Sequence, residues 1–302
     1  MLELIVTCAR SKSRAPVRRL CLRSVRRGPT PQIAAEWISR LKVAVGETIP
    51  AADLYRGDHW VHARRAADRV TQFGGRAWVC SAGYGLIPIS AKLHPYSATF
   101  TPGDRDTVPD PTEWWEALAG WEGPAPGQPR RIIELVASSP DRILLVAVSE
   151  PYLRALTPSL LAARSSLKTP DRLVIICVGA PEGHQLADNI LPCDARVQRH
   201  VGGALTAVNA RVVCGLLQDI PAAEWWPRSF RERLAAWLAG LRPQASRVGR
   251  RVPDEVVTTF IRERLADIPE ASWSALHREF RDSGLACVDT RFARLFRSIR
   301  KV

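Results

Sequence analysis

Short apolar runs recur along the first 180 residues, and each has the length of one buried strand. They are Leu2–Cys8, Trp78–Cys80, Arg142–Val148 and Arg172–Val178. Apolar residues at helical spacing fill most of the intervening segments. Strands that alternate with helices are typical of a parallel sheet. We therefore predict an α/β fold with a doubly wound parallel sheet of four or five strands, in which segment 196–201 forms a last short strand.

Glycine pairs divide this part of the chain. A single long helix is expected over residues 52–73, because Gly74-Gly75 stops it and leads into the second apolar run. Gly202-Gly203 precedes another expected helix, 205–218. A glycine pair before a helix is compatible with an anion site, since free backbone N–H groups point at the gap. It is equally compatible with a simple change of chain direction.

The chain changes character near Pro221, beyond which no strand-like run occurs. Apolar periodicity predicts helices over 228–241, 254–267, 273–281 and 289–300, and the short break between the last two is typical of helix-turn-helix units. The last helix has an apolar face, with Arg291 and Arg294 elsewhere on its surface. We predict an α/β catalytic domain over 1–220 and a helical nucleic-acid-binding domain over 221–302. A bracing bundle with solvated basic faces is the alternative.

The charge points to a polyanionic partner. The 302 residues include 43 basic and 30 acidic side chains, a net charge of +13, and most of the basic residues are arginines. Arginine binds phosphate in a bidentate manner, and basic proteins gain affinity for nucleic acid through counterion release. Eight basic residues, including Arg10 and Lys12, lie in a stretch without any acid between residues 4 and 35. This stretch follows the first strand, so we expect it to bind phosphates.

The seven cysteines are scattered and form no Cys-x-x-Cys pair. Their spacing argues against a disulfide framework or a zinc site and favours a cytoplasmic protein. No apolar run approaches the roughly 20 residues that span a bilayer. We therefore expect no membrane association, no metal, no cofactor and no obligatory protein partner.

The stretch after the second strand carries the candidate chemistry. Ser81-Ala82-Gly83-Tyr84-Gly85 leaves what we expect to be the carboxyl edge of the sheet, where ligands bind in open α/β folds. Tyr96, Asp104 and Asp106 follow. Aromatic rings and carboxylates together suit a nucleobase and chemistry on its sugar. The alternative is an ordinary turn with surface acids.

Several of these motifs together resemble a known family. Cys8 with Lys12, the segments 52–55 and 81–87, and Pro95-Tyr96 resemble the YaaA and tRNA-guanine-transglycosylase-like family, whose fold is similar to that of uracil-DNA glycosylase. Segments 96–108 and 202–211 look like a bacterial branch associated with phage defence, closest to the Brig-type anti-phage DNA glycosylases. One departure is that the Gly-Gln-Asp-Pro-Tyr motif of uracil-DNA glycosylases is absent.

The resemblance implies hydrolysis of the N-glycosidic bond of a modified base, such as glucosylated hydroxymethylcytosine in phage DNA, which leaves an abasic site. Such an enzyme flips its nucleotide out of the stack and places a carboxylate near C1′. The expected catalytic carboxylate is Asp106, with Asp53 and Asp104 as reserves. The expected base and sugar contacts are Ser81, Tyr84, Tyr96 and Asn209. The expected phosphate and DNA contacts are Arg10, Lys12, Gly202, Gly203, Arg211, Arg291 and Arg294.

Two other functions fit the same sequence. A non-catalytic DNA-binding protein would use the same basic charge on a degenerate α/β scaffold, and its binding would depend strongly on salt. Base exchange on RNA, the transglycosylase reaction, usually comes with a zinc site, which the scattered cysteines do not supply. We rank it third.

Overall fold

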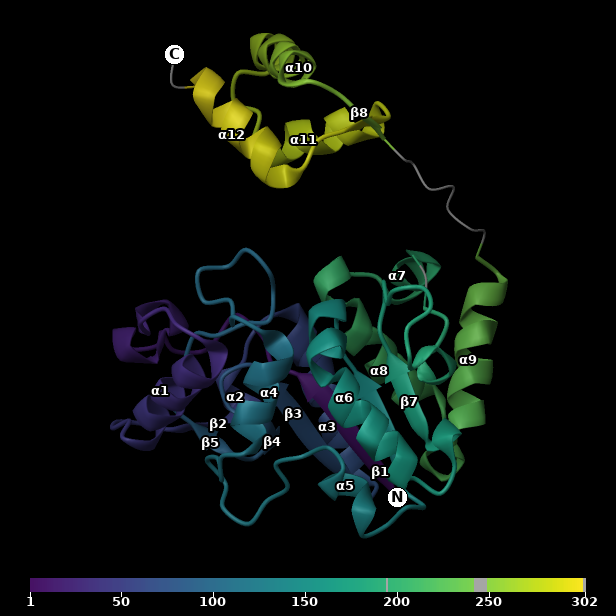
Figure 1. The fold of residues 1–302 in the computed structure, drawn as a ribbon. Coiled ribbons are helices and arrows are strands. Elements are labelled where there is room, and N and C mark those ends of the chain that lie inside the picture. Colours follow the sequence, from purple (N-terminus) through teal and green to yellow (C-terminus); the bar gives the residue numbers. More distant parts are fainter. Residues whose placement is uncertain (194, 242–248, 301–302) are drawn as a thin grey trace. The chain divides into compact units, whose positions relative to one another are not determined.

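A computed structural model describes residues 1–193, 195–241 and 249–300 of the chain. The chain divides into two compact units, residues 1–243 (unit 1) and residues 244–302 (unit 2), and each is described by itself. Unit 1 contains a five-stranded sheet with helices on both faces (Figure 1). The predicted α/β class is confirmed.

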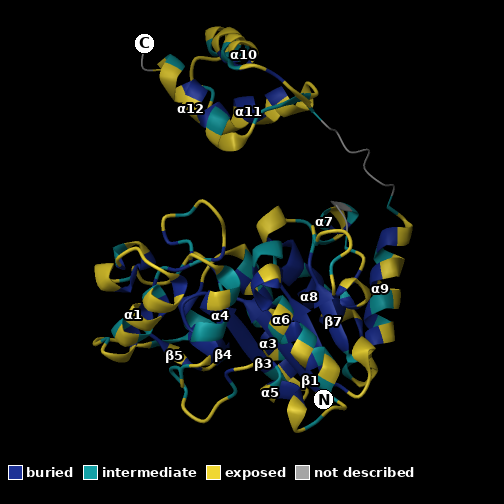
Figure 2. Cartoon of the chain, viewed as in Figure 1, coloured by how far each residue is buried: buried dark blue, intermediate teal, exposed yellow. Residues whose placement is uncertain are grey.

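The central sheet of unit 1 has the strand order β4-β3-β1-β6-β7. Strands β3, β1, β6 and β7 are parallel. Every residue of β1 is buried, because the strand has neighbours on both sides and helices above and below it (Figure 2). The strands are β1 (Leu2–Thr7), β3 (Arg76–Ser81), β4 (Gly85–Pro88), β6 (Ile143–Ala147) and β7 (Leu173–Ile176).

The sheet is not wholly parallel, because β4 pairs with β3 in antiparallel register. Residues 81–85 are therefore the turn of a β-hairpin and not an open loop that leaves the sheet. Gly85 adopts a φ of 74°, a left-handed conformation that other residues rarely adopt. The hairpin turns the chain back into the core, and this burial decides the positions of Ser81 and Tyr84.

Helices cover both faces of the sheet. On one face α3 contacts β1 and β3, and α8 contacts β6 and β7. On the other face α4 contacts β4 and α6, and α1 contacts α4. The helices of unit 1 are α1 (Thr30–Lys42), α2 (Ala51–Leu54), α3 (Asp58–Gln72), α4 (Pro111–Ala119), α5 (Glu134–Ala137), α6 (Glu150–Ser166), α7 (Ala195–Val201), α8 (Val208–Asp219) and α9 (Pro227–Ala239). A two-residue antiparallel pair, β2 (Ile49–Pro50) with β5 (Lys92–Leu93), completes unit 1.

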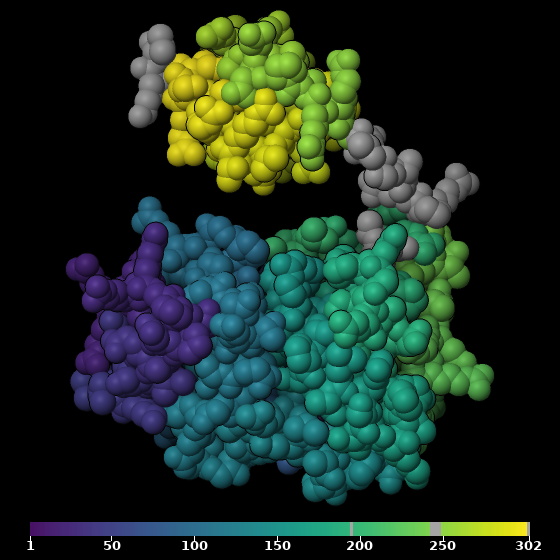
Figure 3. All heavy atoms as spheres, in the orientation of Figure 1, coloured from purple at the N-terminus to yellow at the C-terminus, as the bar shows by residue number. Residues whose placement is uncertain are grey.

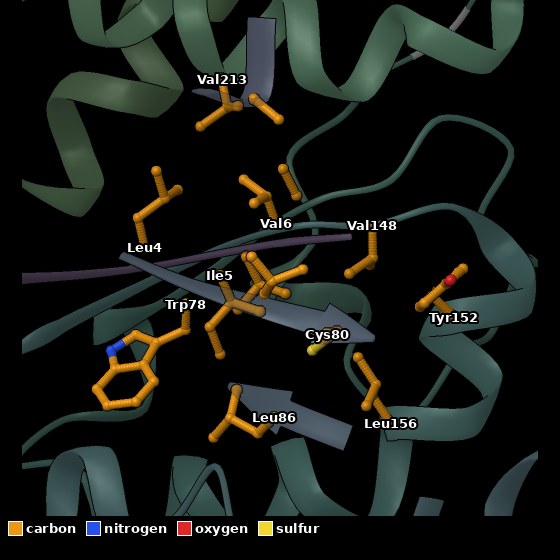
Figure 4. Packing of buried hydrophobic residues seen from close by; sticks show 14 of the residues in the cluster. Leu4, Ile5, Val6, Trp78, Cys80, Leu86, Val148, Tyr152, Leu156 and Val213 are labelled. Atoms are coloured by element: carbon orange, nitrogen blue, oxygen red, sulfur yellow. The ribbon is translucent and has the colours of Figure 1, made fainter. Parts of the chain in front are cut away.

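The apolar core joins residues that are distant in sequence. Figure 4 shows Ile5 of β1, Trp78 of β3 and Leu86 of β4 near one another, with Val213 of α8 farther away. Tyr152 lies beside the arrowhead end of the strand that carries Cys80. The core therefore reaches the carboxyl edge of the sheet.

Three sequence-based boundaries need correction. The expected helix over 52–73 is broken between α2 and α3, where Gly57 has a φ of 97°. The expected strand over 196–201 is the helix α7, whose Val197 is buried against the main core. The unit boundary falls at 243/244 and not at 220/221, because α9 packs Phe230, Leu234 and Leu238 into the core of unit 1. That apolar stripe at spacing i, i+4, i+8 requires a partner surface, which α7 and α8 provide.

Unit 2 is a small helical unit with its own core. It contains β8 (Arg250–Arg251), α10 (Asp254–Asp267), α11 (Trp273–Asp282), β9 (Leu285–Ala286) and α12 (Asp289–Arg300). Phe280 and Phe292 are fully buried at its centre. The three predicted helices of this unit are confirmed, and within the described residues no helix of either unit is long and apolar enough to span a membrane.

Candidate functional site

The order of the strands places the topological switch point of the sheet between β1 and β6. The chain leaves β1 for β3 on one side and later returns to β6 on the other side. In open α/β sheets the carboxyl ends of two such strands diverge, and ligands bind there. Cys8 directly follows β1, and Tyr152 lies in the first turn of α6, which follows β6.

Cys8 and Tyr152 join the two segments that meet at this switch point. The Cys8 Sγ atom and the Tyr152 hydroxyl lie 3.0 Å apart, although the residues are 144 positions apart in sequence. Burial raises the pKa of the Tyr152 phenol, so that the hydroxyl keeps its proton. Tyr152 also packs edge-on against Phe100, with ring centroids 4.8 Å apart. The side chain is thus held firmly at the edge of the sheet.

Three hydroxyl groups form a buried network next to this pair. The Ser81 and Tyr96 hydroxyls are 2.8 Å apart, and the Tyr55 hydroxyl lies 3.1 Å from that of Tyr96. All three residues have no exposed surface. Ser81 Oγ also accepts hydrogen bonds from the backbone N–H groups of Gly83 and Tyr84. Burial raises the pKa of both tyrosines, so the network is neutral.

Lys12 lies over this network. Its Nζ atom is 4.3 Å from the centroid of the Tyr96 ring and 5.7 Å from that of Tyr55. Within the described residues, the amine donates hydrogen bonds to the carbonyl oxygens of Ala9 and Arg10, each at 3.3 Å. Burial lowers the pKa of the Lys12 ammonium, and the neighbouring Cys8 and Asp106 oppose this shift only in part. Lys12 is therefore not a freely solvated phosphate ligand.

Asp106 is 2% exposed and fully bonded. Its Oδ1 atom accepts the backbone N–H of Arg23 at 2.8 Å, and Oδ2 accepts the Ser97 hydroxyl at 2.7 Å and the Arg23 guanidinium. Asp104 lies beside it, where one oxygen accepts the Asp106 N–H and the other pairs with Arg10 at 2.7 Å. The structure thus brings Asp106, Asp104, Arg10 and Lys12 to one edge.

Segment 9–29, which contains no acidic residue, lies at this edge. Residues 1–241 hold 30 basic and 22 acidic residues, and the eight basic residues of segment 9–29 equal that entire surplus. Four of its arginines are exposed and form no ion pair within the described part of the chain: Arg18, Arg19, Arg26 and Arg27. The segment forms part of the surface of unit 1, coloured purple in Figure 3. Unpaired arginines on a surface loop favour an anionic partner.

The other two expected base contacts, like Ser81 and Tyr96, lie in the interior. Tyr84 is 2% exposed, donates its hydroxyl proton to the carbonyl of His94 at 3.1 Å, and packs edge-on against Tyr96. The Asn209 side chain joins the ends of two strands. Its Oδ1 atom accepts the Val178 N–H at 2.8 Å, and its Nδ2 donates to the Val148 carbonyl at 2.7 Å. These residues shape the edge and present no free group to a base.

Other expected residues do not join the group formed by Asp106, Asp104, Arg10 and Lys12. Arg211 pairs with Asp58 through two nitrogens, at 3.0 and 2.6 Å, so its guanidinium is occupied within the fold. Gly202 and Gly203 have left-handed φ values of 67° and 79°, and a Cβ on Gly203 would lie 2.3 Å from Arg211 Nε. The left-handed backbone and the close approach of Arg211 therefore explain why glycine occupies both positions, without an anion site. Asp53, half exposed on α2, pairs with Arg64 at 2.6 Å.

The two arginines expected to contact DNA in unit 2 share one carboxylate. Arg291 and Arg294 lie 2.5 and 3.1 Å from the oxygens of Asp254. Arg291 also donates to the carbonyl of Val252 at 3.0 Å. The triad ties α12 to the start of α10, so at least Arg291 has a structural role. Arg294 is 65% exposed and retains access to solvent.

Sequence reasoning missed several residues of the candidate site. Tyr55, Tyr152, Arg23 and Ser97 were not singled out as site residues. Tyr55 belongs to the hydroxyl network, Tyr152 contacts Cys8, and Arg23 and Ser97 hold Asp106. His59 of α3 is another, with Nε2 3.0 Å from the carbonyl of Thr7 at the end of β1. Burial lowers its pKa and keeps the ring neutral. The only local signal was position, since Tyr152 follows a strand as Cys8 does.

No group of three or more histidine, cysteine, aspartate or glutamate residues is arranged to hold a metal among the described residues. A groove of about 1060 Å³ lies beyond the carboxyl end of β7 and is lined mostly by apolar residues of segment 177–193 and α9. None of the expected site residues lines it.

The chain was compared with family models, with curated proteins and with solved structures, and no match was found in any of the three.

Proposed function

We propose that this protein is a DNA glycosylase that hydrolyses the N-glycosidic bond of a modified base, with the β1/β6 switch point of unit 1 as its active site. The observation that carries the proposal is that a buried carboxylate, Asp106, acts electrostatically on a half-buried amine, Lys12, in a segment that also exposes four unpaired arginines. The parallel order of β3, β1, β6 and β7 and the motifs that resemble the uracil-DNA-glycosylase-like families support the same class.

The electrostatics of the edge suit this reaction. Cleavage of an N-glycosidic bond leaves positive charge on C1′ and O4′ of the sugar, and a fixed negative charge close by lowers the barrier. Asp106 provides such a charge, because three donors hold its carboxylate in one orientation. The exposed arginines at positions 18, 19, 26 and 27 bind the phosphates that flank the flipped nucleotide. The modified bases of phage DNA, glucosylated hydroxymethylcytosine among them, are the first substrates to test.

The decisive experiment is to incubate the full chain with unmodified, hydroxymethylated and glucosylated DNA and to detect abasic sites by alkaline cleavage. Asp106→Asn should abolish abasic-site formation and leave DNA binding nearly intact. Asp53→Asn is the matched control, because this carboxylate lies half exposed on α2 and should not affect catalysis. If no modified DNA acquires abasic sites with the wild-type protein, the proposed function is wrong.

The second candidate is a DNA-binding protein without catalytic activity. It is favoured by the buried, internally bonded state of Ser81, Tyr84, Tyr96 and Asn209, which leaves few free groups for base recognition. Both candidates predict salt-dependent DNA binding, and only the glycosylase alters the DNA. The same abasic-site assay therefore separates them.

The arginine surface has its own test. We expect replacement of the four unpaired arginines by glutamine to reduce the slope of log K against log salt by about 0.9 for each lost phosphate contact. Arg228→Gln is the matched control, since Arg228 is equally exposed but pairs with Glu232 on α9. A slope unchanged by the fourfold replacement would show that this segment does not contact the phosphates.

A further inference from the structure

We propose that the amine of Lys12 is the nucleophile of this reaction and attacks C1′ of the sugar, so that the base leaves through a covalent enzyme–DNA intermediate. This inference rests on the proposed function and deepens it, because it assigns the protein a second chemical capacity, cleavage of the DNA strand at an abasic site.

The hydrogen bonds of Lys12 fit an uncharged amine. An ammonium group has three N–H donors, whereas a neutral amine has two and a lone pair. The Lys12 amine finds two acceptors, the carbonyl oxygens of Ala9 and Arg10. Within the described part of the chain it forms no ion pair with Asp106 or any other carboxylate. These two acceptors match the two N–H donors of a neutral amine, which is the form whose nitrogen lone pair can attack.

Burial of the side chain favours the same state. The Nζ atom of Lys12 lies over the buried rings of Tyr55 and Tyr96. Their faces attract a cation, but the loss of solvent has the larger effect and lowers the pKa of the amine. Desolvation of this kind is one of the ways in which proteins activate a lysine nucleophile.

The neighbours of Lys12 can stabilise the positive charge that develops during the reaction. Asp106 is close enough for its negative charge to act on the Lys12 amine, and it is fixed by Arg23 and Ser97. Positive charge that develops on C1′ and then on the nitrogen would therefore be stabilised from one side. Cys8, another neighbour of the amine, forms the 3.0 Å contact with Tyr152 at the switch point. The amine is thus placed at the edge where the substrate must enter.

The step balances without an external oxidant or reductant. The lone pair of the Lys12 nitrogen forms a bond to C1′, the C1′–N bond to the base breaks, and its electron pair leaves with the base. The attached nitrogen loses a proton, which the departing base takes up through water. The C1′–O4′ bond then opens, O4′ receives a proton from water, and an iminium ion links Lys12 to C1′. Hydrolysis releases an abasic site, whereas loss of a C2′ proton expels the 3′ phosphate and cuts the strand.

The scarcity of lysine makes the inference easy to test. The chain has only five lysines, Lys12, Lys42, Lys92, Lys168 and Lys301, against 38 arginines. Arginine does not form such an imine under these conditions, because its guanidinium stays protonated. Lys168 is a suitable control, as it is 62% exposed and pairs with Asp141, which precedes the amino end of β6.

The experiment uses the full chain and a labelled DNA duplex that carries one preformed aldehydic abasic site, with sodium borohydride present. Borohydride reduces the iminium ion to a stable secondary amine, so the intermediate is trapped as a protein–DNA adduct. We expect the wild-type protein to form the adduct, and peptide mapping to place it on Lys12. Lys12→Met should lower the yield by more than about 100-fold, because removal of the nucleophile closes the covalent route. Lys168→Met should leave it unchanged.

A second variant separates nucleophilic attack from phosphate binding. Lys12→Arg keeps a positive charge and should retain DNA binding, but it should form no adduct. An adduct on another amine, equal yields for Lys12→Met and wild type, or no adduct with the wild-type protein would each overturn the inference.

The proposed function fails by a different result. Base release from modified DNA together with no trapped adduct would refute the nucleophile and leave the glycosylase in place. A Lys12 adduct on the abasic duplex without base release from any modified DNA would refute the glycosylase, and strand cleavage at abasic sites would then remain as the activity of the protein.

Discussion

Replacement of Asp106 by asparagine should weaken the fold as well as the reaction. The two carboxylate oxygens accept the Arg23 N–H, the Arg23 guanidinium and the Ser97 hydroxyl. An asparagine has one oxygen, so in either orientation its NH₂ group faces at least one of these donors. A buried donor without an acceptor costs about 1–3 kcal/mol, and hydrogen bonds to a charged group contribute about 1.5–3 kcal/mol each.

We expect the free energy of unfolding of Asp106→Asn to fall by about 2–4 kcal/mol, since the Arg23 guanidinium is half exposed and adds little. For a unit of this size the melting temperature should drop by roughly 5–15 °C. Urea denaturation followed by circular dichroism measures the first quantity, and a thermal melt measures the second. Abasic-site assays on this variant should therefore be run well below its melting temperature.

Asp104→Asn is the matched control. Asparagine can still accept the Asp106 N–H through its one oxygen, and Arg10, which is 86% exposed, can turn to solvent. Its cost should stay below about 1 kcal/mol. If Asp106→Asn is within about 0.5 kcal/mol of the wild type, the carboxylate is not held as described, and its role as a fixed charge near C1′ loses its basis.

Three further results are expected. Arg130→Met should reduce the free energy of unfolding by about 3–5 kcal/mol, because the buried guanidinium donates to four backbone carbonyls that would lose their partner. Urea denaturation measures this loss, and a loss below about 1 kcal/mol would contradict the prediction. Asn209→Ala should cost about 2–4 kcal/mol and increase amide hydrogen exchange at the ends of β6 and β7, whereas unchanged protection would refute its joining role. The hydrogen bond from Arg211 lowers the pKa of Asp58, so this pair stabilises the fold at neutral pH and the contribution is lost as the pH falls from about 4 through the lowered pKa. The urea midpoint should show this acid-side loss in the wild type and not in Arg211→Met, and equal pH profiles would contradict it.

The sequence by itself determined the alternation of strands and helices, because burial on both faces requires continuous apolar runs such as Leu2–Cys8. It also determined the charge of the basic segment, since composition needs no geometry. The three helices of unit 2 followed from apolar spacing alone. The extent of α9 followed in the same way, but not its membership of unit 1, because an apolar stripe does not say which surface covers it.

The tertiary structure alone decided which polar residues meet. A hairpin turn at Gly85 buried Tyr84, and an antiparallel partner for β3 is not visible in a pattern of single residues. The 3.0 Å contact of Cys8 with Tyr152 joins residues 144 positions apart, which only the strand order brings together. Lys12 changed from an expected phosphate ligand to a half-buried amine because its loop folds over Tyr96. Hydrogen bonding and desolvation depend on these distant neighbours, and a sequence read residue by residue does not contain them.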